Sequence, residues 1–251
     1  MVSWVSLGVF MKSRKDGYGY NERLFSSGLR SKLHFARFQW FTSEVRKRNC
    51  HTNSVLELGC FDGKLIDFLP RKPSRYIGFD ANWEGGLDLA KARWGGAANF
   101  LFLQASSPDE MRLKSSDVFD IAVAMETLEH VPPNMVDGYI RKIAQHLEGY
   151  FFVTVPNEKG VVFLAKWLAT RILSKDAEHY SLSELANATL GRMDLVARRE
   201  HKGFDYVSLV KNIEKYFDVI DVSGHPLGFL PYSLCFGIGI VAKSRAYASS
   251  P

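Results

Sequence analysis

The stretch Ser54-Val55-Leu56-Glu57-Leu58-Gly59-Cys60-Phe61-Asp62-Gly63-Lys64 decides the fold of this chain. Its mainly apolar residues 55–58 predict a short buried strand, residues 59–63 a tight loop, and residues 64–69 the start of a helix. In open α/β sheets, a strand-loop-helix unit forms a ligand crevice at the carboxyl ends of the strands. There the loop backbone can approach a bound molecule closely.

Further strands and helices alternate along the rest of the chain. Strands are predicted at residues 75–80, 99–104, 119–125 and 150–155, and helices at 32–47, 85–93 and 136–147. This alternation is typical of a parallel sheet with helices on both faces. A helix at 206–217 and two strands, 219–223 and 233–243, end the chain in a predicted antiparallel hairpin. The fold class is therefore α/β, a doubly wound and mostly parallel sheet of seven strands.

The regions outside the sheet are predicted from their composition. Residues 1–31 are expected to form a flexible N-terminal arm, 32–243 the α/β domain, and 244–251 a C-terminal tail. Within the domain, the stretch 160–202 holds two helical patterns and is long enough to be a lid inserted over the sheet. Translation starts at Met1 or at Met11, and the sequence leaves this choice open.

Composition is that of a globular protein in a reducing compartment. Of the 251 residues, 46% are hydrophobic and 24% charged, and the net charge of +5 is too small to indicate a partner. The three cysteines, Cys50, Cys60 and Cys235, are odd in number and widely spaced, which argues against a disulfide framework or a Cys-type zinc site. Residues 1–10 are far shorter than the roughly 20 residues of a membrane span. We expect a cytoplasmic protein, and the sequence leaves its oligomeric state open.

Over residues 32–243 the order of these parts resembles the class I S-adenosylmethionine-dependent methyltransferases, which have a Rossmann-like fold. The resemblance rests on residues 57–63, on Asp80 after the second strand, and on residues 125–131 after the fourth. It implies that the first loop receives the methionine part of S-adenosylmethionine, that the acid binds the ribose hydroxyls, and that residues after the third strand border the adenine. The implied cofactor-binding residues are Glu57, Gly59, Cys60, Phe61, Asp62, Gly63, Asp80, Ala81, Gln104, Ala105 and Met125.

The loop departs from the family pattern at one position. Phe61 stands where the family usually has a second glycine, and we expect its ring to cover the methionine arm of the cofactor or to narrow the pocket. The alternative of a dinucleotide dehydrogenase is disfavoured because the glycine spacing of residues 59–63 is not G-x-G-x-x-G. A loop that merely turns the chain would make Asp80 and the later motif coincidences.

An acid-histidine set follows the fourth strand. If the chain turns helical there, the spacing of Glu126, Glu129 and His130 brings all three side chains to one face. Two carboxylates and an imidazole can hold a divalent cation, with Mg²⁺ or Mn²⁺ ahead of Zn²⁺. His201 is the first choice for a further ligand and His179 the second. The alternatives are that His130 acts as a base without metal, and that the acids are solvated.

The same set resembles that of small-RNA 3′-end 2′-O-methyltransferases, in which Glu, Glu, His and a downstream His hold a metal. Residues 126–131 also resemble ubiquinone-pathway and sugar O-methyltransferases. The common chemistry is methylation of one hydroxyl of a diol or catechol, with Glu129 and His130 as the catalytic residues. Among acceptors we favour a hydroxyl of a sugar or other diol over a polyprenyl phenol and over an RNA 3′ end. A cofactor-binding protein without catalysis is the alternative from another class.

Two possible partners follow from the surface residues. The segment 161–173 is apolar, with Lys166 and Arg171, and can lie at the inner membrane face as an amphipathic helix or pack as a lid helix on the sheet. Nucleic acid is disfavoured because the basic clusters at 12–15, 46–48 and 198–199 are not interleaved with aromatic residues. The expected partner is a small molecule or a glycan.

Overall fold

The computed structural model describes residues 29–173, 179–199 and 201–245. Most of the predicted arm 1–31, most of the tail 244–251, and both candidate start residues lie outside the described residues. The strands are β1 (Ser54–Leu58), β2 (Arg75–Asp80), β3 (Phe100–Gln104), β4 (Phe119–Met125), β5 (Leu147–Pro156), β6 (Phe217–His225) and β7 (Gly237–Ser244). The α-helices are α2 (Leu29–Lys47), α3 (Gly86–Trp94), α4 (Pro133–Ala144), α5 (Gly160–Leu173), α6 (Leu182–Thr189) and α7 (Tyr206–Glu214).

The seven strands form one sheet in the order β3-β2-β1-β4-β5-β7-β6. The first five run parallel, and β7 lies antiparallel to both β5 and β6. The doubly wound, mostly parallel sheet with an antiparallel terminal pair is thus confirmed. Since the chain winds outward in opposite directions from β1 and β4, the carboxyl ends of these two neighbours flank the crevice of the sheet.

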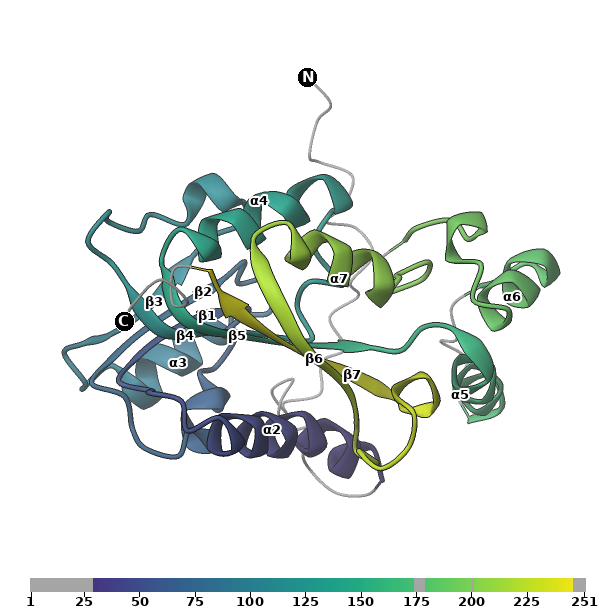
Figure 1. Ribbon diagram of the computed structural model, residues 1–251, viewed down its shortest axis with the longest axis horizontal. Helices are drawn as coiled ribbons and strands as arrows, with labels where there is room; N and C mark the ends of the chain where they lie inside the picture. The colour runs from purple at the N-terminus through teal and green to yellow at the C-terminus, as the bar shows by residue number, and fades with distance from the viewer. Residues whose placement is uncertain (1–28, 174–178, 200, 246–251) are drawn as a thin grey trace.

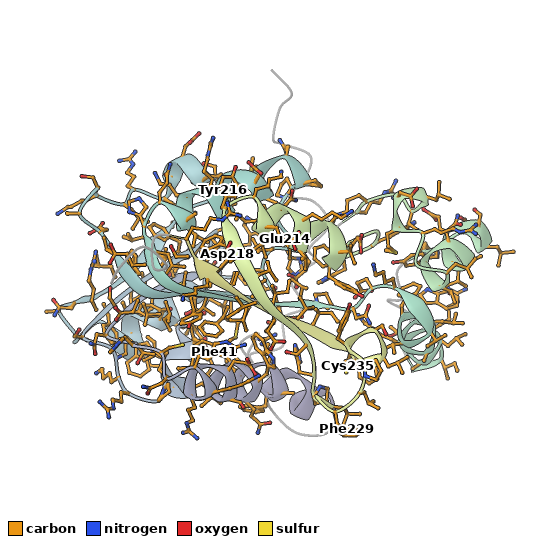
Figure 2. The ribbon with its side chains drawn as sticks, in the orientation of Figure 1. Phe41, Glu214, Tyr216, Asp218, Phe229 and Cys235 are labelled. Carbon is orange, nitrogen blue, oxygen red and sulfur yellow. The ribbon has the colours of Figure 1, made fainter. Side chains whose placement is uncertain are left out.

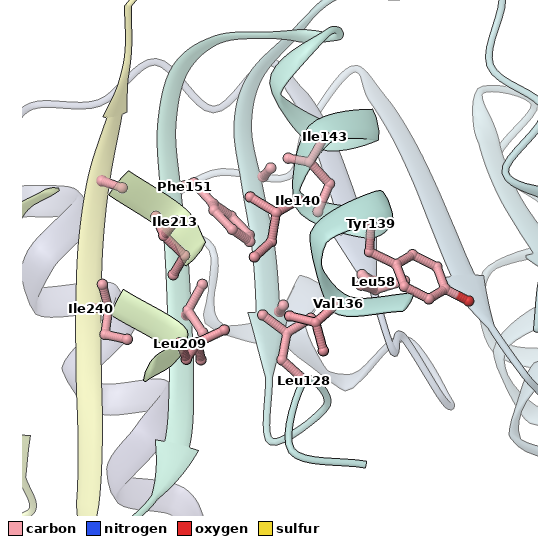
Figure 3. Close-up of a cluster of buried hydrophobic side chains, with 14 of the residues drawn as sticks. Leu58, Leu128, Val136, Tyr139, Ile140, Ile143, Phe151, Leu209, Ile213 and Ile240 are labelled. Atoms are coloured by element: carbon pink, nitrogen blue, oxygen red, sulfur yellow. The ribbon is translucent and has the colours of Figure 1, made fainter. Parts of the chain in front are cut away.

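Two layers of helices cover the sheet (Figure 1). On one face, Ile140 and Ile143 of α4 and Leu209 and Ile213 of α7 pack against the strands that carry Phe151 and Ile240 (Figure 3). On the other face lie α2 and α3. Successive residues of a strand point to opposite faces, and burial of each such side chain contributes about 2–3 kcal/mol. These layers fix the carboxyl ends of the strands.

The helix α2 covers the second face from its position ahead of β1. Its Phe41 is fully buried (Figure 2). The ring of Phe41 meets that of Phe152 in β5, with centroids 5.3 Å apart and ring planes at 89°. Because α2 leads through residues 48–53 into the start of β1, it runs opposite to that strand. The N-terminal half of α2 therefore lies toward the carboxyl ends of the parallel strands.

The helices α5 and α6 lie beyond one end of the sheet (Figure 1). Together with the 3₁₀ helix η4 (Met193–Leu195) they bury their own apolar cluster, formed by Phe163, Ala188, Met193 and Val196. The ammonium group of Lys202 holds this unit together, since it donates to the carbonyl of His179 and to the carboxylate of Glu184 at 2.9 Å each.

Several element boundaries differ from the prediction. Residues 64–69 contain a 3₁₀ helix, η2 (Lys64–Phe68), in place of an α-helix. The helix α4 begins three residues early, at Pro133, because proline is well suited to the first turn of a helix. The 3₁₀ helix η5 (Tyr232–Leu234) follows Pro231, so β7 begins at Gly237 and not at residue 233.

Candidate active site at the carboxyl edge of the sheet

The loop after β1 depends on two glycines. Gly59 and Gly63 have φ of 77° and 70°, a backbone conformation that favours glycine. A Cβ atom at position 59 would lie 2.1 Å from Oγ1 of Thr127, and one at position 63 would lie 2.9 Å from Cδ1 of Trp94. The loop is therefore packed so tightly that only bare backbone fits at both positions.

Asp80 joins this loop to the end of β2. Its Oδ2 accepts a hydrogen bond from the backbone N–H of Phe61 at 3.0 Å, and its Oδ1 accepts one from Asn82 at 2.6 Å. Each carboxylate oxygen retains a lone pair, which suits the two hydroxyls of a ribose. On the neighbouring strand, the N–H of Ala105 donates to the carbonyl of Asp80 at 2.9 Å.

The other predicted cofactor residues lie around the same edge. Gln104 donates from Nε2 to the carbonyl of Ala81 at 3.2 Å, so the pair predicted beside the adenine is next to the pair predicted beside the ribose. Oδ1 of Asp62 accepts from the N–H of Lys64 at 3.1 Å and stabilises the end of the loop. Met125 is the buried last residue of β4. The structure thus brings the predicted set together.

Two side chains of the loop unit point into the protein. Glu57 accepts a hydrogen bond from the hydroxyl of Tyr76, and burial raises the pKa of its carboxyl well above the usual value. Burial also raises the pKa of the Cys60 thiol, and Sγ of Cys60 packs where a Cβ at Gly78 would be, 2.6 Å away. Cys60 therefore presents its backbone, and not its thiol, to the crevice.

Phe61 adopts a positive φ of 43° although it is not a glycine. Its ring packs at the start of α3, where a Cβ atom on Gly86 would lie only 2.3 Å from Cδ2. The glycine at position 86 therefore makes room for the ring.

The chain after β4 forms a turn, and the expected helix over residues 126–130 is wrong. Glu126 has a φ of 50° and its N–H still pairs with the carbonyl of Thr154 in β5 at 2.8 Å. A single turn follows, closed by the N–H of His130 on the carbonyl of Thr127 at 3.0 Å. The prolines at 132 and 133 disfavour helical conformation just before them, so α4 cannot begin earlier.

The turn nevertheless brings an acid and two imidazoles together. One ligand atom each of Glu129, His130 and His201 lies within 4.8 Å of the others, and the two imidazole centroids are 4.2 Å apart. Both carboxylate oxygens of Glu129, Oε1 of Glu126 and Nδ1 of His201 are buried without a hydrogen-bond partner among the described residues. His179 is exposed and is not part of this group.

Burial disfavours the charged forms of Glu126, Glu129 and His201. Burial, followed by the neighbouring Glu126, raises the pKa of Glu129 well above its usual value, and burial raises that of Glu126. Burial, with the charge of His130 next, lowers the pKa of His201 to about 3. A neutral imidazole and buried carboxyl groups without partners are suited to a divalent cation, because coordination supplies the charge that burial removes.

The turn also touches the cofactor loop. The hydroxyl of Thr127 donates to the carbonyl of Leu58 at 3.3 Å and to that of Met125 at 3.0 Å. Arg198 donates from Nη2 to the carbonyl of Glu129 at 2.6 Å and lies over the ring of Phe204, 5.0 Å from its centroid. The turn that carries Glu129 and His130 is thus in direct contact with the end of β1 and the glycine loop.

Sequence reasoning missed the charged residues around the cluster. Glu158, just after β5, is buried and forms an ion pair with Lys166 of α5. Arg37 of α2 opposes the rise in the pKa of both Glu126 and Glu129. Glu158 had a signal, because an acid directly after a neighbouring strand falls at the same edge of the sheet. Arg37 had none, since its place depends on how α2 packs.

The comparison with known families decides the class of protein. The sequence model of a methyltransferase domain family matches residues 22–209, which is most of the chain. The chain belongs to this family. It is a methyltransferase that uses S-adenosylmethionine, in agreement with the glycine loop and Asp80 described above.

Individual relatives of this methyltransferase are distant. A ubiquinone biosynthesis O-methyltransferase of Hahella chejuensis is 28% identical over 111 residues, which span 43% of this chain and only 46% of that protein. A S-adenosylmethionine-dependent methyltransferase of Clostridium acetobutylicum has a TM-score of 0.62 at 11% identity, over 89% of this chain and 98% of that one. The methyltransferase domain of bacterial CtHen1 has a TM-score of 0.57 at 17% identity, over 84% and 99%. At such identities the solved structures show the shared fold.

Among the residues that the structure describes, every helix is too short or too polar to cross a membrane.

Proposed function

We propose that this methyltransferase transfers the methyl group of S-adenosylmethionine to a hydroxyl of a sugar or another diol, with the help of a divalent cation. One observation carries the proposal: Glu129 is fully buried, both its carboxylate oxygens are without hydrogen-bond partners, and two imidazoles lie within 4.8 Å. A carboxyl group in that position costs free energy unless something pairs with it. A cation would be such a partner.

The candidate ligands are Glu126, Glu129, His130 and His201. Three of them converge within 4.8 Å, while Glu126 lies close enough to raise the pKa of Glu129. A bound Mg²⁺ or Mn²⁺ supplies Lewis-acid stabilisation of negative charge on an acceptor oxygen. The chain itself supplies orientation, because the Thr127 hydroxyl fixes this turn against the cofactor loop. That contact holds the acceptor side of the crevice beside the methyl donor.

A specific observation favours a second mechanism, in which His130 is the base and no metal takes part. His130 is the exposed member of the cluster, with 38% of its side chain accessible, and its Nε2 lies 4.0 Å from Oε1 of Glu129. It can accept the proton of an acceptor hydroxyl at a ring nitrogen, and an ionised Glu129 would stabilise the resulting imidazolium.

One experiment separates the two mechanisms and tests the function. Methyl transfer from labelled S-adenosylmethionine to fractions of a cell extract is measured with and without a chelator, for the wild type, Glu129→Ala and Glu148→Ala. Glu148 is the matched control because it is an exposed glutamate near the start of β5, at the opposite edge of the sheet. We expect both chelation and Glu129→Ala to abolish transfer, while Glu148→Ala retains it.

The other outcomes are equally informative. Transfer that survives exhaustive chelation removes the metal from the proposal and leaves the base mechanism. Calorimetric binding of S-adenosylmethionine without transfer to any glycan, phenol or RNA fraction favours a non-catalytic binding protein. Labelling of a polyprenyl phenol or of an RNA 3′ end would replace the sugar or diol as acceptor.

The proposed location is the cytoplasm, with contact to the inner membrane face through residues 161–173. The support is that α5 leaves Val161, Leu168 and Ile172 exposed, the last by 81%, while its Phe163 is buried in the adjoining cluster. An amphipathic helix with exposed apolar and basic residues can lie in an interface. Sedimentation with anionic liposomes should be reduced by Ile172→Glu. Absence of any sedimentation contradicts this contact.

A further inference from the structure

His225 is a buried imidazole at the same edge of the sheet as the acid-histidine cluster. It ends β6 and pairs with Gly237, which in turn pairs with Pro156 at the end of β5. The strand beside β5 is β4, which leads into Glu126. His225 and Glu126 therefore lie at the same edge of the sheet, with β5 and β7 between their strands.

A glycine in the neighbouring strand β7 leaves space for this ring. A Cβ atom at Gly237 would lie 2.0 Å from Cε1 of His225, so only glycine allows the imidazole to lie there. Two residues further along β7, Gly239 makes room for Trp40 of α2 in the same way, with 2.2 Å to Cε2. The two rings are neighbours, with centroids 6.2 Å apart.

One ring nitrogen of His225 is buried and, within the described part of the chain, unpaired. The residue is only 7% exposed, and its Nε2 is buried without a hydrogen-bond partner among the described residues. Burial, followed by the charge of Arg37, lowers the pKa of the imidazole to about 4, so the ring is neutral near pH 7. A neutral imidazole offers one donor and one acceptor, which matches a hydroxyl group better than an anion or a cation.

Arg37 connects this imidazole to the reaction site. The positive charge of Arg37 favours a lower pKa at His225, Glu126 and Glu129. The guanidinium therefore lies within electrostatic range of His225 and of the two acids. Arg37 precedes Trp40 by one turn of α2, on the half of the helix that lies toward the carboxyl edge. Nothing in the reaction of a single hydroxyl requires a third imidazole beside His130 and His201.

We infer that His225 binds a second hydroxyl group of the acceptor, separate from the hydroxyl that receives the methyl group. The inference rests on the proposed function, since it assumes a polyhydroxyl acceptor in the crevice. His225 is then a residue that determines specificity: the acid-histidine cluster takes the reacting hydroxyl, and Nε2 of His225 selects acceptors that carry another hydroxyl at the right separation.

The test compares His225→Phe, which keeps the ring volume, with His225→Gln, which keeps a polar nitrogen. His146→Phe is the matched control, because His146 is also 7% exposed but bonds through Nδ1 to the carbonyl of Asp117 near the start of β4, at the other edge. Kinetics use the acceptor fraction labelled by the wild type. We expect His225→Phe to raise the KM for the acceptor about tenfold, as the loss of one hydrogen bond predicts, with S-adenosylmethionine affinity unchanged.

His225→Gln should stay within about threefold of the wild type. An unchanged acceptor KM in His225→Phe, with thermal stability lowered as in His146→Phe, overturns the inference and leaves the proposed function intact. If the wild type labels no hydroxyl acceptor, the proposed function fails separately. In that case ¹⁵N-histidine spectra of the S-adenosylhomocysteine complex with methyl glucoside decide: a shift of the Nε2 resonance of His225 supports the subsite, and no shift refutes it.

Discussion

Replacement of His225 should change how the stability of the protein depends on pH. In the folded protein the pKa of His225 is lowered from 6.5 to about 4, first by burial and then by Arg37, the charged residue that faces it from α2. The ring also contacts the indole of Trp40 and the bare backbone of Gly237, which carry no charge. Between about pH 6.5 and pH 4 the unfolded chain therefore binds a proton at His225 that the folded chain does not bind.

The sign and size follow from this difference. Because the folded pKa is lowered, the contribution of His225 to stability is fully present above about pH 6.5 and is lost as the pH falls toward 4. At about 1.4 kcal/mol for each unit of pKa, roughly 2.5 kcal/mol of the free energy of unfolding should disappear between about pH 7.5 and pH 4.5. His225→Phe and His225→Gln have no such proton to bind.

Urea unfolding at the two pH values measures this quantity. Both variants should lose about 2.5 kcal/mol less than the wild type on acidification, whatever their stability near neutral pH. The comparison between variant and wild type cancels the other titrating groups. Equal losses in the three proteins would mean that His225 is readily protonated in the folded state, and would refute the buried, neutral imidazole.

Three further predictions concern the crevice. Glu129→Gln should leave the metal-free protein at least as stable as the wild type, but Mn²⁺ should no longer stabilise the variant. For the wild type, Mn²⁺ at a hundredfold excess over Kd should add about 2.7 kcal/mol to the free energy of unfolding. Thermal denaturation with and without Mn²⁺ measures both effects. Asp80→Ala should weaken S-adenosylmethionine binding about tenfold or more in calorimetry, because hydrogen bonds to a charged group are lost, and equal affinity would remove Asp80 from the ribose site. Gly59→Ala should cost at least about 1–2 kcal/mol of stability from its positive φ alone, and the clash with Thr127 adds to this; an unchanged urea midpoint would contradict the close approach of the two loops.

The sheet could be predicted from sequence because its signals are local. The strands β1, β2 and β4 are mainly apolar, as expected for strands buried on both faces, and their ends were predicted to within one residue. Boundaries near prolines were less accurate. Pro133 starts α4 and Pro231 delays β7, and in both places the conformation of a proline decides over the hydrophobic pattern.

The site was predicted in part, for a related reason. The sequence predicts Glu129, His130 and His201 as metal ligands from their residue types and spacing. The structure brings the three together, although the chain forms a turn there and not a helix. Arg37 and His225 could not be found, because the surroundings of each depend on the packing of elements far apart in sequence. The ring of His225 fits only because another strand has a glycine at position 237. A local sequence pattern cannot predict a contact between two strands.

The contact of Phe61 with Gly86 has a consequence for the history of this chain. The ring of Phe61 occupies the space that a Cβ atom at position 86 would need, so this ring and a side chain at position 86 cannot both be present. A lineage that gains a ring at position 61 must already have a glycine at position 86, and it cannot lose that glycine while the ring remains. Relatives with glycine at position 61 are free of this constraint, so the two loops should vary together as a pair across the family.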